Sequence, residues 1–332
     1  MGKATDNKGR WSGLTREFGA LTGLLLICVA LSIAKPESFP HADNLLNVLT
    51  QVTPVAVVAA GMTLVIISGG IDLSVGSVLS FSACAGGYLA VSLGMNVWIA
   101  MLGSLLVGLA FGALNGLMVT KVGLPPFITT LGTMGMARGL AFRITGGGTI
   151  YNLDKPFLYL GSERVGGVLP AAILVFVVVY IVGHLLLTRT RVGRYTYAIG
   201  GSEDASRLSG VPVGRTKVFV YAATGLLSAV AGIIMAGRVS AIAPQAGDGF
   251  ELDVIAAVVI GGTSLSGGQG RLVGSIIGAL IMGTVRNGLN LMLIDSNWQR
   301  VVIGSIIILA ATIDVLQKRG GIRAFSARSE KC

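Results

Sequence analysis

Long apolar runs recur along the whole chain, and no other feature limits its possible folds as strongly. An apolar helix needs roughly 17–25 residues to cross a hydrocarbon core of ~30 Å. Runs that suit a crossing lie at 18–34, 54–70, 74–94, 97–119, 126–144, 168–187, 218–237, 250–266, 271–294 and 300–316. Charged residues make up only 12% of the chain, about half of their share in a soluble protein, so a soluble globule would lack a polar surface. The sequence therefore predicts an all-α polytopic membrane protein with about ten transmembrane helices, some of them short or broken.

Many of the basic residues gather in three segments, which are 1–17, 188–217 and 318–332. Cytoplasmic segments of membrane proteins are enriched in Lys and Arg, so we expect all three on the cytoplasmic side. Six runs precede the central segment and four follow it, and these even numbers agree with that placement. We therefore expect one transmembrane domain at 18–317, a cytoplasmic loop within it at 188–217, and a cytoplasmic segment at each end. The net charge of +10 would suggest nucleic acid in a soluble protein, but the positive-inside rule explains the clustering better, so we expect membrane lipid and no nucleic acid as a partner.

The run at 250–266 is the weakest of the ten. Its purely apolar part, Val254 to Ile260, is too short to cross a membrane. The basic tail would nevertheless lie outside the cell if this run did not cross. We therefore expect a short or broken helix that its neighbours shield from lipid, because irregular backbone at membrane depth must be buried in protein or face water.

An eight-residue pattern, GGxxLSxG, occurs at 69–76 and again at 261–268, each time after an apolar helix. The candidate residues in the two copies are Gly69, Gly70, Asp72, Ser74, Gly261, Gly262, Ser264 and Ser266. One interpretation is a tight turn between two spans. The other is a break in a discontinuous helix that lines the substrate path, as in many transporters. Asp72 carries the same ambiguity, because a carboxylate near the membrane core is either functional or the cap of the following helix.

The second copy of the pattern contains the letters LSGGQ at 265–269, which imitate the signature of ATP-binding cassette (ABC) ATPases. Such an ATPase also needs a phosphate-binding loop of the form GxxxxGK[ST], and the sequence contains none. No constellation of His, Cys or Asp has the spacing of a metal or catalytic site. We therefore expect no enzyme activity, no ATPase site and no cofactor bound by this chain.

The central basic loop contains its own helix signals. Ser202 suits an N-cap, and Glu203 and Asp204 place acids in the first turn, where the helix dipole favours them. Gly210 and Pro212 then stop the helix. The pattern predicts a short cytoplasmic helix at 202–210, which is either a linker or an element that another protein grips.

Three stretches together resemble the permease subunit of bacterial sugar ABC importers, the ribose-type group. They are GMTLVIISGGIDLSVGSVL (61–79), GRYTYAIGGSEDASRLSGV (193–211) and ELDVIAAVVIGGTSLSGGQGRLVGSIIGALIMG (251–283). The resemblance extends from about residue 20 to 317. It implies a type II ABC importer fold in the bacterial inner membrane. It also implies three partners: an ABC ATPase subunit that uses ATP and Mg²⁺, an extracytoplasmic sugar-binding protein, and a second permease that is identical or related.

By that resemblance, Glu203, Asp204, Ala205 and Gly210 match the motif through which permeases couple to the ATPase. Asp204 replaces the usual alanine, and Gly210 lies one place later than in the common form. The substrate stays open among ribose, another monosaccharide, a polyol and an autoinducer-like ligand. Two further classes are less well matched. An ion-coupled transporter would need several intramembrane carboxylates, and a membrane-embedded enzyme would need a catalytic constellation.

Overall fold

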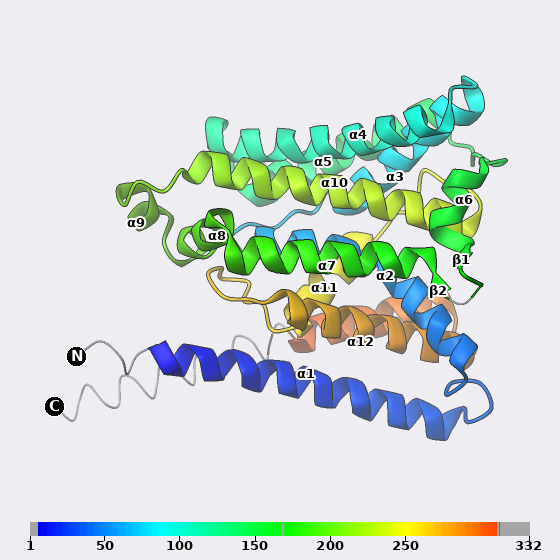
Figure 1. Ribbon diagram of the computed structural model, residues 1–332, viewed down its shortest axis with the longest axis horizontal. Helices are drawn as coiled ribbons and strands as arrows, with labels where there is room; N and C mark the ends of the chain where they lie inside the picture. Colours follow the sequence, from blue (N-terminus) through cyan, green and yellow to red (C-terminus); the bar gives the residue numbers. More distant parts are fainter. Residues whose placement is uncertain (1–5, 168, 311, 313–332) are drawn as a thin grey trace.

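The computed structural model describes residues 6–167, 169–310 and 312. The expected tail at 318–332, the first five residues and the end of the last predicted span lie outside this part. The described chain is all-α apart from one small hairpin, and Figure 1 shows its long helices side by side along one common direction. Helices α8 and α9 project at one end of this array, and α6 with the hairpin covers the other.

In chain order the elements are α1 (Asp6–Ala34), α2 (Ala42–Ile67), α3 (Val75–Gly87), the π-helix η1 (Tyr88–Ser92), α4 (Val97–Leu117), the π-helix η2 (Met118–Val122), α5 (Pro126–Thr145), α6 (Lys155–Ser162), β1 (Arg164–Val165), β2 (Leu169–Pro170), α7 (Ala171–Arg189), α8 (Arg191–Gly201), α9 (Glu203–Leu208), α10 (Val213–Val239), α11 (Phe250–Ile260) and α12 (Leu272–Leu291). A further helix covers 296–310. Strands β1 and β2 pair in antiparallel register, Arg164 with Pro170 and Val165 with Leu169.

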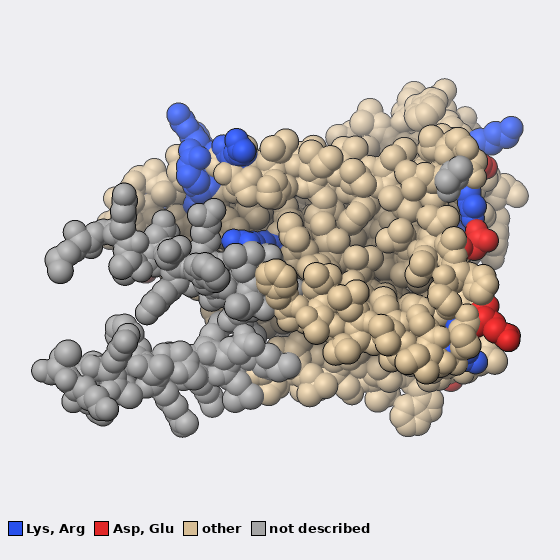
Figure 2. Space-filling model, turned by 60° about the horizontal axis from the view of Figure 1, so that its bottom comes forward, with Lys and Arg blue, Asp and Glu red and all other residues tan. Residues whose placement is uncertain are grey.

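Six helices of the described chain are long and apolar enough to cross a membrane, counting α3 with η1 and α4 with η2. The others of the six are α2, α7, α10 and α12. The apolar part of α1 (Phe18–Ala34) is a shorter apolar helix, and α5, the segment containing α11 and the helix at 296–310 lie where the other expected spans were placed. On the face that Figure 2 shows, charged side chains gather at the two ends and a broad uncharged band lies between them. The polytopic all-α prediction is confirmed.

Helix α2 forms the centre of the hydrophobic core and packs against α7, α10, α11 and α12. The predicted span at 54–70 is wrong in its start, because α2 already begins at Ala42. Polar residues in the first turns hid the helix from a search for apolar runs. One of them, Asn44, exchanges two amide hydrogen bonds with Asn287 of α12, at 3.2 and 2.9 Å. A polar side chain inside a bundle is tolerated when it is paired in this way.

Small residues set the closest helix contacts. Gly108, Gly112 and Gly116 of α4 lie against the backbone of α10, and a Cβ atom on Gly112 would lie within 2.3 Å of the carbonyl oxygen of Tyr221. Gly278 of α12 approaches the backbone of α11 at Ala257 in the same way, and Gly274 approaches Gly261, directly after α11. Such contacts hold membrane helices together by close backbone approach.

Helix α11 is a half-helix, because 11 residues span only about 16 Å. The irregular segment 240–249 before it runs back along α3. Ile242 lies beside Gly87, and the amide of Gly247 donates to Ser80 Oγ at 2.7 Å. Most of α11 is buried by its neighbours. The expectation of a short helix shielded from lipid is therefore confirmed.

Candidate functional site: helix α9 and the glycine loops

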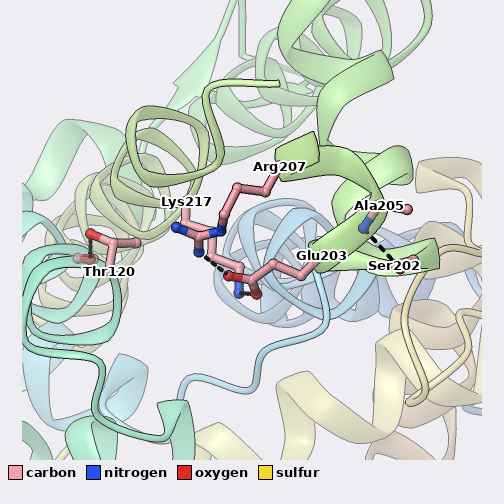
Figure 3. A network of polar contacts seen from close by, with 7 residues as sticks. Thr120, Ser202, Glu203, Ala205, Arg207 and Lys217 are labelled. Carbon is pink, nitrogen blue, oxygen red and sulfur yellow. Dashed lines mark hydrogen bonds and ion pairs between the residues drawn. The ribbon is translucent and has the colours of Figure 1, made fainter. Parts of the chain in front are cut away.

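Helix α9 is built by the signals that the sequence predicts for 202–210. Ser202 has an extended backbone, and its hydroxyl accepts the amide of Ala205 at 3.3 Å (Figure 3). Glu203 and Asp204 occupy the first turn, where acids complement the helix dipole. The result is a two-turn helix with a satisfied N-terminus.

Glu203 ties α9 to α10. Its carboxylate accepts one hydrogen bond from Lys217 at 2.5 Å and another from Arg207 at 3.0 Å (Figure 3). The side chain of Lys217 is only 10% exposed, and that of Glu203 is 40% exposed. The Lys217 hydrogen bond is the main cause that lowers the pKa of Glu203, partial burial opposes it, and Arg207 acts in the same direction as Lys217. The ion pair therefore fixes the orientation of α9 on the end of α10.

Gly210 ends α9 in a left-handed conformation, with φ of 77°. Its amide donates to Arg207 O, and the next amide, of Val211, donates to Ser206 O. This pair of bonds is a Schellman cap. A Cβ atom on Gly210 would meet no atom within 4 Å, so backbone conformation, rather than close packing, demands glycine here.

The tip of α9 faces away from the rest of the chain. Asp204 and Ala205 are exposed, and the side chain of Leu208 is 90% exposed. An exposed leucine and several charged residues therefore lie together on a short helix at one end of the molecule.

Helix α8 connects this tip to the two glycine loops, 68–74 and 261–271. The C-terminal turn of α8 lies directly against the backbone of Ile67 and Gly268. A Cβ atom on Gly200 would overlap the carbonyl oxygen of Ile67 and the amide of Gly268. Tyr197 also donates its hydroxyl proton to Gly270 O at 2.6 Å. The two loops touch each other as well, since a Cβ atom on Gly267 would lie 3.1 Å from the Cα atom of Gly69. Helix α8 therefore lies between α9 and the second glycine loop, and it also contacts the end of α2 directly before the first loop.

Each of the two loops begins where a helix ends, and the two helices end in the same type of C-terminal cap. Gly69 has φ of 82° and Gly262 has φ of 88°. In each case two amides close a Schellman cap on the preceding helix: Gly69 and Gly70 on α2, Gly262 and Thr263 on α11. The structural match pairs Gly69 with Gly262, so it is shifted by one residue from the sequence match, which pairs Gly69 with Gly261.

Gly70 and Gly261 have a different role, because both lie in close packing. A Cβ atom on Gly70 would lie 2.3 Å from Tyr221 Oη. A Cβ atom on Gly261 would lie equally close to the backbone of Gly274. The first glycine loop is thereby held against α10 and the second against α12.

Asp72 is buried, with 1% exposure. One carboxylate oxygen accepts the amide of Ser74 at 2.8 Å and the Ser74 hydroxyl at 2.6 Å. Asn115 of α4 donates to Ser74 Oγ at 2.9 Å, and Thr133 of α5 donates to Asn115 Oδ1 at 2.7 Å. Asp72 therefore stabilises the entry into α3 and joins it to α4 and α5. Sequence reasoning missed Asn115 and Thr133, which form this network only through long-range contacts.

The second glycine loop folds as a longer turn. The amide of Ser264 donates to Gln269 O, and Ser264 Oγ accepts the amide of Ser266 at 3.3 Å. Gly267 and Gly268 both have positive φ. The LSGGQ letters thus form a turn that contacts α8 and α2 of the same chain. Lys217 is a further residue that sequence reasoning missed, although its place in a basic loop near predicted acids was a usable signal.

Comparisons with known proteins agree along almost the whole chain. A family model described as "Branched-chain amino acid transport system / permease component" matches residues 44–311. The ribose import permease RbsC of Bacillus subtilis is 43% identical over 306 residues, which cover 92% of this chain and 94% of that protein. The L-arabinose transport system permease AraH of Escherichia coli is 40% identical over 300 residues, which cover 90% of each.

A third relative, the D-allose transport system permease AlsC of Escherichia coli, is 35% identical over 301 residues, which cover 90% of this chain and 92% of that protein. One solved structure, described as a metal-chelate type ABC transporter in an inward-facing conformation, aligns with a TM-score of 0.52. The alignment covers 92% of this chain and 98% of that one at 17% identity. At this identity the likeness concerns the fold alone.

Proposed function

The chain belongs to the family of transport-system permease components, and we propose that it is the membrane-spanning subunit of an ABC importer for a monosaccharide, with ribose as the first candidate. Relatives between 35 and 43% identical are permeases for ribose, allose and arabinose. All three ligands are uncharged polyhydroxy compounds, which supports the sugar class more strongly than any one sugar.

The observation that supports this function best is the connection from α9 to both glycine loops. We propose that α9 sits in a groove of the ATPase subunit, with Glu203, Asp204, Ala205 and Gly210 shaping the contact. ATP-driven closure of the ATPase can move membrane helices only through an element that keeps its shape. The Lys217 ion pair and the two caps give α9 that rigidity.

ATP hydrolysis is assigned to the partner. The sequence has no phosphate-binding loop, and its LSGGQ letters form a turn bound to the same chain. ATP and Mg²⁺ are accordingly used by the ATPase subunit, and this chain binds no cofactor of its own.

The remaining partners follow from the orientation. We place α9 and both chain ends on the cytoplasmic side of the inner membrane, so that α6 and the hairpin face outward toward a sugar-binding protein. A second permease, identical or related, completes the membrane part of the importer.

Reconstitution tests the proposal. The chain is co-expressed with its ATPase, placed in liposomes and supplied with the cognate binding protein and ATP. We expect ATP-dependent uptake of radiolabelled ribose, with allose, arabinose and leucine as competitors. Uptake of leucine alone would contradict the sugar class, and uptake driven by an ion gradient without ATP would contradict the ABC mechanism.

A further inference from the structure

A cavity of about 320 Å³ lies between α4 and α6, at the end of the molecule opposite α9 (Figure 1). It is lined by Trp98 and Met101 of α4 and by Lys155, Pro156, Tyr159 and Leu160 of α6. Its volume falls in the range of about 300–1,000 Å³ that small-molecule sites occupy. The lining residues present almost only carbon to the cavity, so it suits a ligand with an apolar part.

The aromatic residues place this cavity at the depth of the lipid headgroups. Trp98 is the second residue of α4, and both Trp98 and Tyr159 are exposed. Trp and Tyr are enriched where a membrane meets water. Below Trp98, the exposed side chains of Leu102 and Leu106 recur every four residues on the same face of α4. The cavity therefore lies beside a surface that meets acyl chains.

One wall of the cavity is firmly held. Phe157 of α6 is completely buried. Gly161 of the same helix lies so close to Gly237 of α10 that a Cβ atom on either residue would overlap the other helix. Helix α6 is therefore fixed on α10, and the cavity exists before a ligand arrives. A ligand loses less free energy to ordering in a preformed site, so it should stay longer here than on an open helix face.

Lys155 gives the cavity a positive charge at its rim. It is the first residue of α6 and is exposed. Among the residues that the structure describes, no carboxylate forms an ion pair with its amine. Its neighbour Asp154 does not line the cavity. A lysine amine is a point charge that binds phosphate, and inorganic phosphate alone would leave the apolar walls uncovered. A ligand that matches both parts combines a phosphate with a long apolar chain.

We propose that one membrane glycerophospholipid binds here, with an acyl chain in the cavity and its phosphate at Lys155. The site lies in the leaflet at the α6 end, which is the outer leaflet in the orientation proposed above. The bound lipid fills the space between α4 and α6. A second copy of the chain or a soluble partner protein would compete for the same surface, and both are outcomes of the test.

Lipid retention tests the phosphate contact. The full-length permease is stripped of lipid in detergent and incubated with palmitoyl-oleoyl phosphatidylglycerol, or with the diacylglycerol that has the same chains and no phosphate. Native mass spectrometry then counts the lipids that stay bound. We expect one phosphatidylglycerol per chain and at least about fivefold less diacylglycerol, because only the former pairs with the amine.

Lys155→Ala should abolish this preference. The matched control is Lys35→Ala, which removes a lysine at the same end of the molecule but outside the cavity (Figure 1), and it should leave the preference unchanged. Equal retention of the two lipids by the native chain, or an unchanged preference in Lys155→Ala, would overturn the phosphate contact.

Filling the cavity tests the acyl-chain site. We expect Met101→Trp to lower phosphatidylglycerol retention at least about fivefold, because the larger side chain occupies the space of the acyl chain. Leu106→Trp adds the same bulk on the open face of α4 and should retain the lipid. Normal retention by a monodisperse Met101→Trp protein would overturn the site.

Photocross-linking of the native chain decides the matter even if Met101→Trp does not fold. A phosphatidylglycerol with a diazirine on its acyl chain should label peptides that contain residues 98–101 and 155–160. Labels spread evenly over α4 and α7 would overturn the proposal. So would a photoreactive residue in place of Tyr159 that captures a second copy or the sugar-binding protein instead of lipid. None of these measurements depends on transport, so they stand apart from the test of the importer function.

Discussion

The two glycine loops stop their helices in the same way and then diverge. Gly69 and Gly262 form matching left-handed caps. After its cap, the first loop reaches α3 within a few residues and places the carboxylate of Asp72 in a buried network. The second loop makes a longer turn that meets α2 and α8 through backbone groups. The repeated sequence therefore specifies a helix stop, and the residues inside each loop determine what the stop supports.

The largest expected effect comes from removing a polar side chain, and its size should differ between the two loops. Asp72→Ala leaves the Ser74 amide and two further donors without their buried acceptor. Each unsatisfied buried group costs about 1–3 kcal/mol, so we expect a loss of about 3 kcal/mol and a sharp fall in folded protein. The measurement is the thermal midpoint in detergent, read by the fraction that stays monodisperse.

Ser264→Ala is the matched control in the second loop. Its hydroxyl accepts one amide, so we expect a loss of about 1 kcal/mol or less. Equal losses at Asp72 and Ser264 would contradict the contrast between a carboxylate network and a backbone turn.

The next effect concerns close packing in the first loop. Gly70→Ala brings a Cβ atom within 2.3 Å of the Tyr221 hydroxyl, and overpacking of this kind costs about 1–3 kcal/mol. That hydroxyl is buried without a hydrogen-bond partner. We therefore expect Tyr221→Phe to cost little by itself and to rescue Gly70→Ala in the double variant. Thermal midpoints of the four proteins form a complete cycle, and additive losses would argue that the clash is relieved in some other way.

Much of this fold is visible in the sequence, and the missing parts have physical causes. Most spans, the half-helix α11 and the start and stop of α9 follow from local patterns of apolar, capping and glycine residues. The early start of α2 was missed because the side chain of Asn44 pairs with that of Asn287, which is distant in sequence. The structural match between the loops is shifted by one residue from the sequence match. This shift was missed because the amino-acid sequence does not reveal which of two adjacent glycines has positive φ. Asn115, which joins the Asp72 network, also comes from a distant segment.

A smaller effect is expected at the caps themselves. Gly69→Ala, Gly262→Ala and Gly210→Ala each force alanine into a left-handed conformation, at a cost of about 1 kcal/mol. We expect similar stability losses at all three sites. Only Gly210→Ala should also reduce co-purification of the ATPase. Full ATPase recovery and normal uptake in that variant would show that α9 is merely a linker.

The smallest effect is the pH dependence of the α9 contact. The pKa of Glu203 is lowered, first by the Lys217 hydrogen bond, from an ordinary value of 4.5. A depressed carboxyl pKa contributes stability above the unfolded value, and that stability is lost as the pH falls through the folded value. The ion pair is therefore fully formed at neutral pH and weakens only below about 4.5.

Because Glu203 is more than one-third exposed, solvent screening keeps the effect small. We expect Glu203→Gln to weaken ATPase binding slightly at pH 7 and to abolish the additional loss that the native protein shows as the pH falls below about 4.5. Glu203→Lys should weaken binding further, because it places a cation beside Lys217 and at the helix N-terminus. Binding of the purified ATPase to the permease in nanodiscs, titrated across this pH range at constant salt, measures the difference. Parallel pH curves for native and Glu203→Gln permease would assign the acid sensitivity to another group and leave α9 oriented by its caps alone.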